Sequence, residues 1–380
     1  MKFLLIYVPN LRFSYKGDWS KRKLNGICQF FKGNGLSKSD LSNEGFPCIL
    51  YGELYTTYKN EVISDIISKT NTTLSNPFLS RNNDLIIPGS GEDPIDIAVA
   101  RAIYQNDIIL GGDLNILRPK SNVSAAFLSY QLNGVRRYDI AKKAQGKSIV
   151  HLHNSDLKEV LVSIPSYEEQ LHIVKLLTKI DEMIEIQSKI IDDYNSLKMG
   201  IYNCMFKENC ADYKLKQLAN IVKGDQINNN QLLSNGSYYM MNGGTLPSGY
   251  LDSYNVSENT ISISEGGNSC GYVQFNKERF WSGGHCYTIQ NVNPLIVENK
   301  YLYHYLKHKE KEIMNLRIGT GLPNIQKKDL ENFTIFVPNL LIQRKNLALF
   351  EMLDEKICIL NEELERLEKQ KKYLLRNLFI

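Results

Sequence analysis

Two stretches of this chain decide its architecture: GKSIVHLHNSDLKEVLVSIPSYEEQ (residues 146–170) and GTGLPNIQKKDLENFTIFVPNLLIQ (residues 319–343). They align without a gap at a shift of 173 positions, which places Pro165 over Pro338. The alignment continues as far as Phe206, and 12 of its 61 residue pairs are identical. A repeat with so long a period predicts a duplicated domain rather than a solenoid of small units.

Weaker matches extend the repeat towards the N-terminus. Residues 18–27 resemble residues 212–221 at a spacing of 194, through an Asp-aromatic pair followed by two aliphatic positions. Further along, GGDLNIL (residues 111–117) aligns with GGHCYTI (residues 283–289). We therefore expect the order globule, helix, globule, helix.

Both helices are predicted by a heptad pattern. Seam positions recur with a 4,3 alternation over residues 173–205 and again over residues 346–378, and eight of the ten positions are apolar in each copy. Such a sustained pattern is typical of a coiled coil, and Lys198 and Lys371 occupy equivalent seam positions, where a polar residue can set the register. A dimerisation stalk is one interpretation. Two matched helices in one chain favour antiparallel pairing with each other.

The segments between the helices have a different sequence pattern. Short β-rich runs such as residues 84–87 and 98–104 are separated by Gly, Asn and Ser, and residues 261–275 read as strand, turn and strand. Residues 125–138 and 300–314 are expected to be helical. The predicted fold class is α+β, with two β-rich domains alternating with two long helices. The predicted borders are 1–165 for the first domain, 166–210 for the first helix, 211–338 for the second domain and 339–380 for the second helix.

The amino-acid composition excludes several classes of protein. The 380 residues carry a formal charge of only +4, which excludes a wholly cationic wrapper of nucleic acid, and 43% of them are hydrophobic, as in ordinary globular proteins. The apolar start at residues 1–10 is too short for a signal peptide and is expected to form a strand. No stretch has the length of a membrane span, so we expect a cytoplasmic protein without a membrane partner. Seven cysteines without a C-x-x-C pair suit reduced thiols.

The basic residues are unevenly distributed. Residues 1–165 contain 20 Lys and Arg against 15 Asp and Glu, whereas residues 166–210 contain 5 against 8. Basic residues cluster just before the first helix and again at the equivalent place in the second copy, interleaved with Tyr, Ser, Asn and Gln. A solvated charged face is the alternative interpretation. The same location in both copies favours contacts with nucleic acid.

The motifs of common catalytic sites are incomplete. AQGKS (residues 144–148) resembles the end of a phosphate-binding loop but has Ala141 where the first glycine should lie. The pairs His151/His153 and His304/His308 lack a third metal ligand nearby, so surface histidines are expected. We predict no catalytic residues, no metal site and no cofactor in this chain.

Taken together, these features resemble the specificity subunit of type I restriction-modification systems. The resemblance rests on an opening P-N-L-R-F, G-D-W and K-L between Pro9 and Leu24, and on a hydrophobic-Pro-x-x-x-x-Q motif that occurs twice. Each motif precedes a long heptad helix that ends in Met-Phe or Leu-Phe. The resemblance implies two target recognition domains that read the halves of a bipartite, asymmetric double-stranded DNA target.

The resemblance also implies partners. The subunit would assemble with two methyltransferase subunits and with restriction and translocase subunits, which would use S-adenosylmethionine, ATP and magnesium. A coiled-coil adaptor or accessory protein that does not bind DNA is the alternative. As hypotheses, DNA contacts are made in the first domain by Arg136, Arg137, Lys142, Lys143, Lys147, Ser148, His151 and Asn154, and in the second by Arg317, Asn324, Gln326, Lys327 and Lys328.

Overall fold

The computed structural model divides the chain into two compact units. Unit 1 comprises Met1–Ser188 and Glu362–Ile380, and unit 2 comprises Lys189–Asn361. The two cuts, after Ser188 and after Asn361, lie 173 residues apart (361 − 188), so they cross both long helices at equivalent positions. The structure describes residues 9–15, 17–205, 210–319, 321 and 323–380. The predicted N-terminal strand at residues 1–10 falls mostly outside these ranges.

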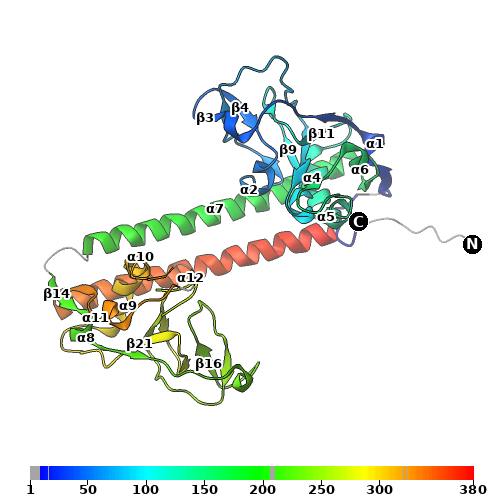
Figure 1. Ribbon diagram of the computed structural model, residues 1–380. Helices are drawn as coiled ribbons and strands as arrows, with labels where there is room; N and C mark the ends of the chain where they lie inside the picture. The colour runs from blue at the N-terminus through cyan, green and yellow to red at the C-terminus, as the bar shows by residue number, and fades with distance from the viewer. Residues whose placement is uncertain (1–8, 16, 206–209, 320, 322) are drawn as a thin grey trace, which may run out of the picture. The chain divides into compact units, whose positions relative to one another are not determined.

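Unit 1 is built on a five-stranded sheet (Figure 1). In spatial order its strands are β2 (Cys28–Lys32), β11 (Leu114–Pro119), β7 (Asp84–Pro88), β9 (Arg101–Ile103) and β5 (Val62–Ile63). Neighbouring strands are antiparallel except β9 and β5. Every residue of the central strand β7 is buried, and α4 (Ala125–Asn133) packs against β7 and β9 to form the core.

Smaller elements complete unit 1. A four-stranded sheet has the order β10 (Ile109–Leu110), β4 (Phe46–Ile49), β6 (Lys69–Thr70) and β3 (Leu41–Ser42). Two further pairs are β1 (Ser20–Lys23) with β13 (Leu161–Ile164), and β8 (Ser90–Gly91) with β12 (Val150–His151). The short helices are α1 (Leu24–Ile27), α2 (Glu53–Thr56), α3 (Pro94–Ile97), α5 (Arg137–Ala141), α6 (Asn154–Lys158) and the 3-10 helix η1 (Lys38–Asp40).

Unit 2 has a four-stranded sheet in which all neighbouring strands are antiparallel (Figure 1). Its order is β15 (Asn220–Lys223), β21 (Cys286–Gln290), β18 (Thr260–Ser264) and β19 (Val273–Asn276). A three-stranded sheet consists of β17 (Gly249–Leu251), β16 (Tyr238–Met241) and β20 (Trp281–Ser282), and β14 (Ala211–Lys214) pairs with β22 (Thr334–Val337). The helices are α8 (Leu215–Leu218), α9 (Asn299–His308), α10 (Glu310–Met314), α11 (Lys327–Glu331) and the 3-10 helix η2 (Asn229–Gln231). The predicted α+β class is confirmed.

The strand register corrects one part of the predicted repeat. Lys23 pairs with Leu161 in unit 1, and Lys214 pairs with Thr334 in unit 2, so the upstream spacing is 191 (214 − 23) and not 194. The error arose because Leu215, Leu218 and Ile221 are spaced by three residues, so that a slip of three still matches aliphatic with aliphatic. The alignment of GGDLNIL with GGHCYTI is confirmed, because β11 and β21 pair with the equivalent strands β7 and β18.

The long helices are α7 (Tyr167–Met205) and α12 (Leu340–Asn377). In unit 1 their segments run antiparallel, since Asp181 contacts Lys371 whereas Gln187, further along α7, donates to Glu363, which lies earlier in α12. In unit 2 Lys198 contacts Asp354. All twenty predicted seam positions are buried or half-buried. Within each unit, the predicted antiparallel pairing is confirmed.

No helix within the described ranges is both long enough and apolar enough to cross a membrane.

Candidate nucleic-acid interface

A short hairpin loop presents several of the predicted contact residues of unit 1. The backbones of Gln145 and His151 exchange hydrogen bonds, in which the N–H of Gln145 donates at 2.9 Å and that of His151 at 2.7 Å. Gly146 has a φ of +134°, which an L-residue rarely adopts, and it turns the chain. As a result Lys147 and Ser148 are exposed at the tip, and His151 is exposed on β12.

Unit 2 repeats this hairpin at a spacing of 173. Ile318 and Asn324 exchange backbone hydrogen bonds of 2.8 and 3.0 Å, and Gly319 has a φ of +103°. Arg317 precedes the hairpin and is exposed. The Nε2 of Gln326 donates to Oδ1 of Asn324 at 2.9 Å, so these two amides are held together on the surface.

Further predicted cations lie on or directly after short helices beside the hairpins. Lys327 and Lys328 begin α11 and are exposed, and Lys327 is paired at 3.7 Å with Glu331. Lys142 and Lys143 directly follow α5, with Lys142 exposed and Lys143 half-buried. The structure thus brings the predicted residues of each copy to one region of its own unit.

Three predicted contact residues are engaged within the chain. Arg136 donates from Nη2 to the backbone oxygen of Ile380 at 2.9 Å and contacts Asp139 at 3.3 Å. Arg137 donates to the backbone oxygen of Ile95 at 3.1 Å. Asn154 donates to the backbone oxygen of Phe31 at 2.9 Å. These side chains are half-buried, and their contacts stabilise unit 1.

The basic neighbourhood of unit 2 is also partly neutralised. Lys307 pairs with Glu310 at 2.5 Å, and Lys309 pairs with Glu312 at 2.6 Å. The corrected repeat identifies a further pair of equivalent lysines. At the spacing of 191, Lys32 matches Lys223, and both are exposed at the end of an edge strand. The sequence signal was present as FKGN (residues 31–34) and VKGD (residues 222–225), but the slipped alignment hid it.

The glycine after each of these lysines permits a close backbone crossing. A Cβ on Gly33 would lie 2.0 Å from the oxygen of Gly111, and a Cβ on Gly224 would lie 2.4 Å from the oxygen of Gly283. Only glycine fits such an approach. The crossing places Lys32 near the turn after Gly111-Gly112, and Lys223 near the turn after Gly283-Gly284. In unit 1 this turn carries Asp113.

In unit 2 the equivalent turn carries His285, which is part of a polar network. Glu265 accepts a hydrogen bond from the Tyr287 hydroxyl at 3.0 Å, contacts Lys223 Nζ at 2.6 Å, and lies 3.7 Å from Nδ1 of His285. Burial, and then Glu265, raise the pKa of the Tyr287 hydroxyl, which therefore stays protonated and donates. Sequence inspection missed Glu265 because it lies 42 residues from Lys223.

A second duplicated site joins the globules to the helices. In unit 1 Lys371 contacts Glu61 and Asp181, each at 2.7 Å, and Tyr130 donates to Asp181 at 2.6 Å. Burial alone would lower the pKa of Lys371, but the two carboxylates raise it above its ordinary value. Burial and the nearby Glu61 raise the pKa of Asp181. One buried cation is thus shared between two carboxylates.

Unit 2 places the equivalent Lys198 and Asp354 in contact, with His304 in the position of Tyr130. The Tyr202 hydroxyl and Nδ1 of His304 are 2.9 Å apart. Burial lowers the pKa of His304 to about 4, so the imidazole is neutral at pH 7. The prediction of surface histidines is wrong for His304, which is 4% exposed, because its helix faces α7 and α12.

The repeated Gln of the Pro-x-x-x-x-Q motif is buried in both units. Gln170 accepts from the backbone N–H of Ser124 at 2.9 Å, and Gln343 accepts from that of Glu298 at 2.8 Å. Ser124 and Glu298 are the N-cap residues of α4 and α9. Each glutamine amide also donates to the oxygen of its motif proline. The motif therefore fastens the start of each long helix to the main helix of its globule.

Exposed apolar side chains mark the outer surfaces of the long helices. Ile186 and Ile359, which are equivalent at 173 residues, are 60% and 43% exposed. Met183 and Met352 are exposed by more than half. Met183 and Met352 are not equivalent, because Lys356 and Lys179 lie at their repeat positions, so Ile186 and Ile359 are the matched exposed pair among these four residues.

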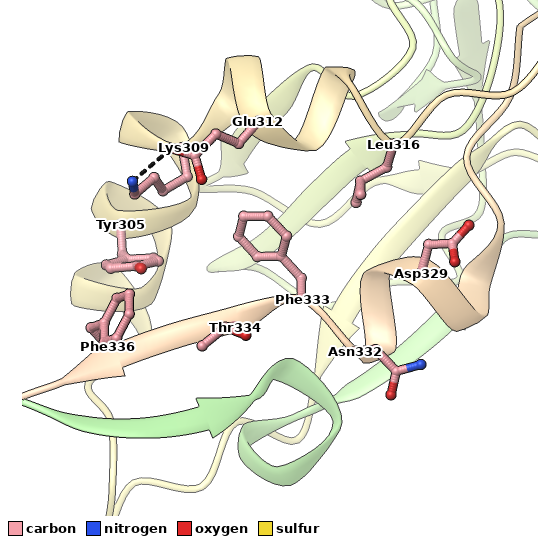
Figure 2. A pocket seen from close by; sticks show the side chains of 9 residues that line it. All are labelled: Tyr305, Lys309, Glu312, Leu316, Asp329, Asn332, Phe333, Thr334 and Phe336. Carbon is pink, nitrogen blue, oxygen red and sulfur yellow. Dashed lines mark hydrogen bonds and ion pairs between the residues drawn. The ribbon is translucent and has the colours of Figure 1, made fainter.

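A groove of about 420 Å³ lies between α9, α10, α11 and β22 in unit 2 (Figure 2). Figure 2 shows the ring of Phe333 directed towards the space between Lys309 and Leu316. Lys309 is engaged with Glu312, and the floor is aromatic. The groove offers an apolar contact surface rather than a pair of acid and base groups. Among the described residues, no group of three or more His, Cys, Asp or Glu could hold a metal ion.

Comparisons with known proteins agree with this architecture. The profile of the family described as the type I restriction modification DNA specificity domain matches residues 16–193 and 207–369. A type I specificity subunit of Mycoplasma pneumoniae is 34% identical over 152 residues, so that the match spans 40% of this chain and 40% of that relative. The type I restriction enzyme MjaX specificity subunit of Methanocaldococcus jannaschii is 22% identical over 405 residues, which cover 94% of this chain and 92% of the relative.

A solved structure shares the fold. The crystal structure of a type I restriction-modification system S subunit from Mycoplasma genitalium covers 98% of this chain and 99% of its own, with a TM-score of 0.71 and 19% identity. A second structure, from work on the assembly of a type I restriction-modification system, gives a TM-score of 0.57 at 15% identity over 96% of this chain and 98% of its own.

Proposed function

Because the chain belongs to the type I restriction-modification DNA specificity family, we propose that it selects the DNA target of a restriction-modification complex by reading a bipartite, asymmetric sequence. The observation that supports this most strongly is the duplicated hairpin. In unit 1 it exposes Lys147, Ser148 and His151, and in unit 2 it exposes Asn324, at the position equivalent to His151, with Arg317 beside it. Cations of this kind attract phosphates, and amides and hydroxyls can read base edges.

The proposed contacts are narrower than the predicted set. They comprise the exposed or half-exposed side chains that are not hydrogen-bonded to backbone oxygens within the described residues: Lys142, Lys143, Lys147, Ser148 and His151 in unit 1, and Arg317, Asn324, Gln326, Lys327 and Lys328 in unit 2. The proposed set excludes Arg136, Arg137 and Asn154, because each of these side chains already donates a hydrogen bond to a backbone oxygen of the chain.

The two half-sites of the target should differ. Unit 1 carries a four-stranded accessory sheet, whereas the accessory sheet of unit 2 has three strands and lacks a counterpart of β3. Side chains presented on such different supports cannot reproduce the same pattern of base contacts, so an asymmetric target follows. The 39-residue helix α7, about 58 Å long at 1.5 Å per residue, is proposed to act with α12 as the spacer that sets the gap between half-sites.

We further propose that the chain is non-catalytic and binds two methyltransferase subunits together with restriction and translocase subunits. The matched exposed residues Ile186 and Ile359 offer two copies of one partner equivalent docking positions. S-adenosylmethionine, ATP and magnesium would then be used by the partners, and the assembly would act on cytoplasmic DNA.

A binding experiment tests the DNA contacts. The complex of the full chain with its methyltransferase subunit is titrated into a fluorescent duplex at several salt concentrations. Replacing Lys142, Lys143 and Lys147 with Ala should weaken binding and lower the slope of log affinity against log salt by up to about 3. The control is Lys179→Ala, which removes a cation paired with Glu182 on α7. Equal slopes for wild type and triple variant would contradict this interface, and no DNA binding by the wild-type complex would favour an adaptor.

A further inference from the structure

The network around Glu265 has features of a prearranged contact site. The Glu265 side chain is 11% exposed, whereas its two neighbours, Lys223 and His285, are 51% and 63% exposed. A carboxylate that is almost buried is costly unless charged or polar groups compensate it. Here the side chains of Lys223 and His285 extend from the buried carboxylate towards solvent.

The network adjoins the hairpin of unit 2. The backbone N–H of Ile325 donates to the oxygen of Glu265 at 2.9 Å, and the N–H of Glu265 donates to the oxygen of His285 at 2.9 Å. Gly266, the next residue, forms a β-bridge with Asn324. Lys223, His285 and Asn324 are therefore presented by three chain segments that main-chain hydrogen bonds hold together.

Unit 1 has the same main-chain arrangement without the carboxylate. Gly89 occupies the position of Glu265, since its N–H donates to the oxygen of Asp113 and its oxygen accepts from Leu152. A Cβ on Gly89 would lie 2.7 Å from the Asp113 oxygen, which leaves no room for a side chain. Lys32 is present at the position of Lys223, but the anchoring acid is specific to unit 2.

We propose that Lys223, His285 and Asn324 form a DNA-backbone contact site of unit 2, in which Glu265 is the positioning residue for Lys223 and His285. This inference rests on the proposed function. Glu265 limits the rotamers of Lys223 before DNA arrives, so that less side-chain entropy is lost on binding. A lysine and an imidazole beside an amide are donors that suit phosphate oxygens.

The charge of Glu265 makes the proposal sharply testable. If the carboxylate did nothing but add negative charge, Glu265→Gln would strengthen DNA binding. A positioning role predicts the opposite sign, with affinity about two- to fivefold weaker, the range that a partly exposed ion pair supports. The matched control is Glu298→Gln, which makes the same charge change in unit 2 at a partly exposed pair with Arg344. It should leave affinity unchanged or slightly raised.

Lys223 variants supply the second measurement. Lys223→Ala should lower the salt slope by about 1 and weaken binding on target and scrambled duplexes alike, whereas Lys223→Arg should keep the slope. Binding is measured by anisotropy with the full chain in complex with its methyltransferase subunit, and thermal unfolding of each variant checks the fold. Tighter binding by folded Glu265→Gln, or an unchanged slope for Lys223→Ala, would overturn the proposal. If Lys327→Ala with Lys328→Ala still weakens binding in that case, the proposed function stands without this site.

Discussion

The buried cation Lys371 is the most informative residue to remove. Its side chain is 18% exposed, and those of its partners Glu61 and Asp181 are 8% and 5% exposed. Lys371→Met keeps the length of the side chain but leaves two buried carboxylates without a cation. Breaking a buried pair in this way costs about 3–5 kcal/mol. The equivalent variant Lys198→Met should cost about 1 kcal/mol or less, because its partner Asp354 is 39% exposed and water can solvate it.

The two tryptophans of the chain permit a separate measurement of unit 1. Trp19 is 3% exposed in the core of unit 1, and Trp281 belongs to unit 2. Urea unfolding followed by fluorescence in a Trp281→Phe background therefore reports on unit 1 through Trp19. Lys371→Met should lower the free energy of unfolding of unit 1 by about 3–5 kcal/mol. The smaller effect of Lys198→Met in unit 2 is measured by hydrogen exchange on α9.

The pH dependence gives a further check on the electrostatic cause. Burial and the nearby Glu61 already raise the pKa of Asp181, and without Lys371 this folded-state pKa should rise further above the value in the unfolded chain. A raised carboxyl pKa means that stability is lost as the pH rises through the unfolded value, so the penalty should be smaller near pH 4 than at pH 7. An equal loss for the Lys371 and Lys198 variants, or a penalty independent of pH, would refute the reasoning.

Three other predictions follow from single sites. The pKa of His304 is about 4 in the folded protein, against an ordinary value of 6.5, so unit 2 should lose at most about 3 kcal/mol of stability as the pH falls between these values. His304→Tyr should remove this pH dependence of the free energy of unfolding, measured by urea unfolding across this window. An unchanged dependence in the variant would exclude His304 as the cause. Arg136→Ala should cost about 1 kcal/mol by releasing the oxygen of Ile380 and leave the salt slope of DNA binding unchanged; a slope lowered by about 1 would return Arg136 to the interface. Ile186→Asp and Ile359→Asp should each remove one methyltransferase subunit, as measured by sedimentation, and retention of both subunits by the double variant would argue against these docking positions.

Periodic features could be predicted because they depend on local spacing. The heptad positions of α7 and α12 are read directly from the sequence, and all are buried or half-buried. The 173-residue repeat located the hairpins because the segment from Gly146 to Gln170 has no insertion relative to its copy. Upstream, the globules differ in length, and the three-residue spacing of Leu215 and Leu218 allowed a slipped match.

Contacts between distant segments could not be predicted. Glu61 lies 310 residues from Lys371, and no spacing rule connects an acid in a globule with a cation in the last helix. The roles of Arg136 and Asn154 were missed for the same reason, because their partners are backbone oxygens that the fold brings near. A basic cluster in sequence is therefore only a first estimate of a DNA-binding surface.

Sequencing of adenine methylation in the genomes of cells with and without this gene tests the central claim most directly. The account predicts a methylated motif of two unlike half-sites separated by a fixed gap, which disappears when the gene is deleted and returns when it is restored. A methylome that does not change on deletion, or a gene-dependent motif that is continuous, would contradict it.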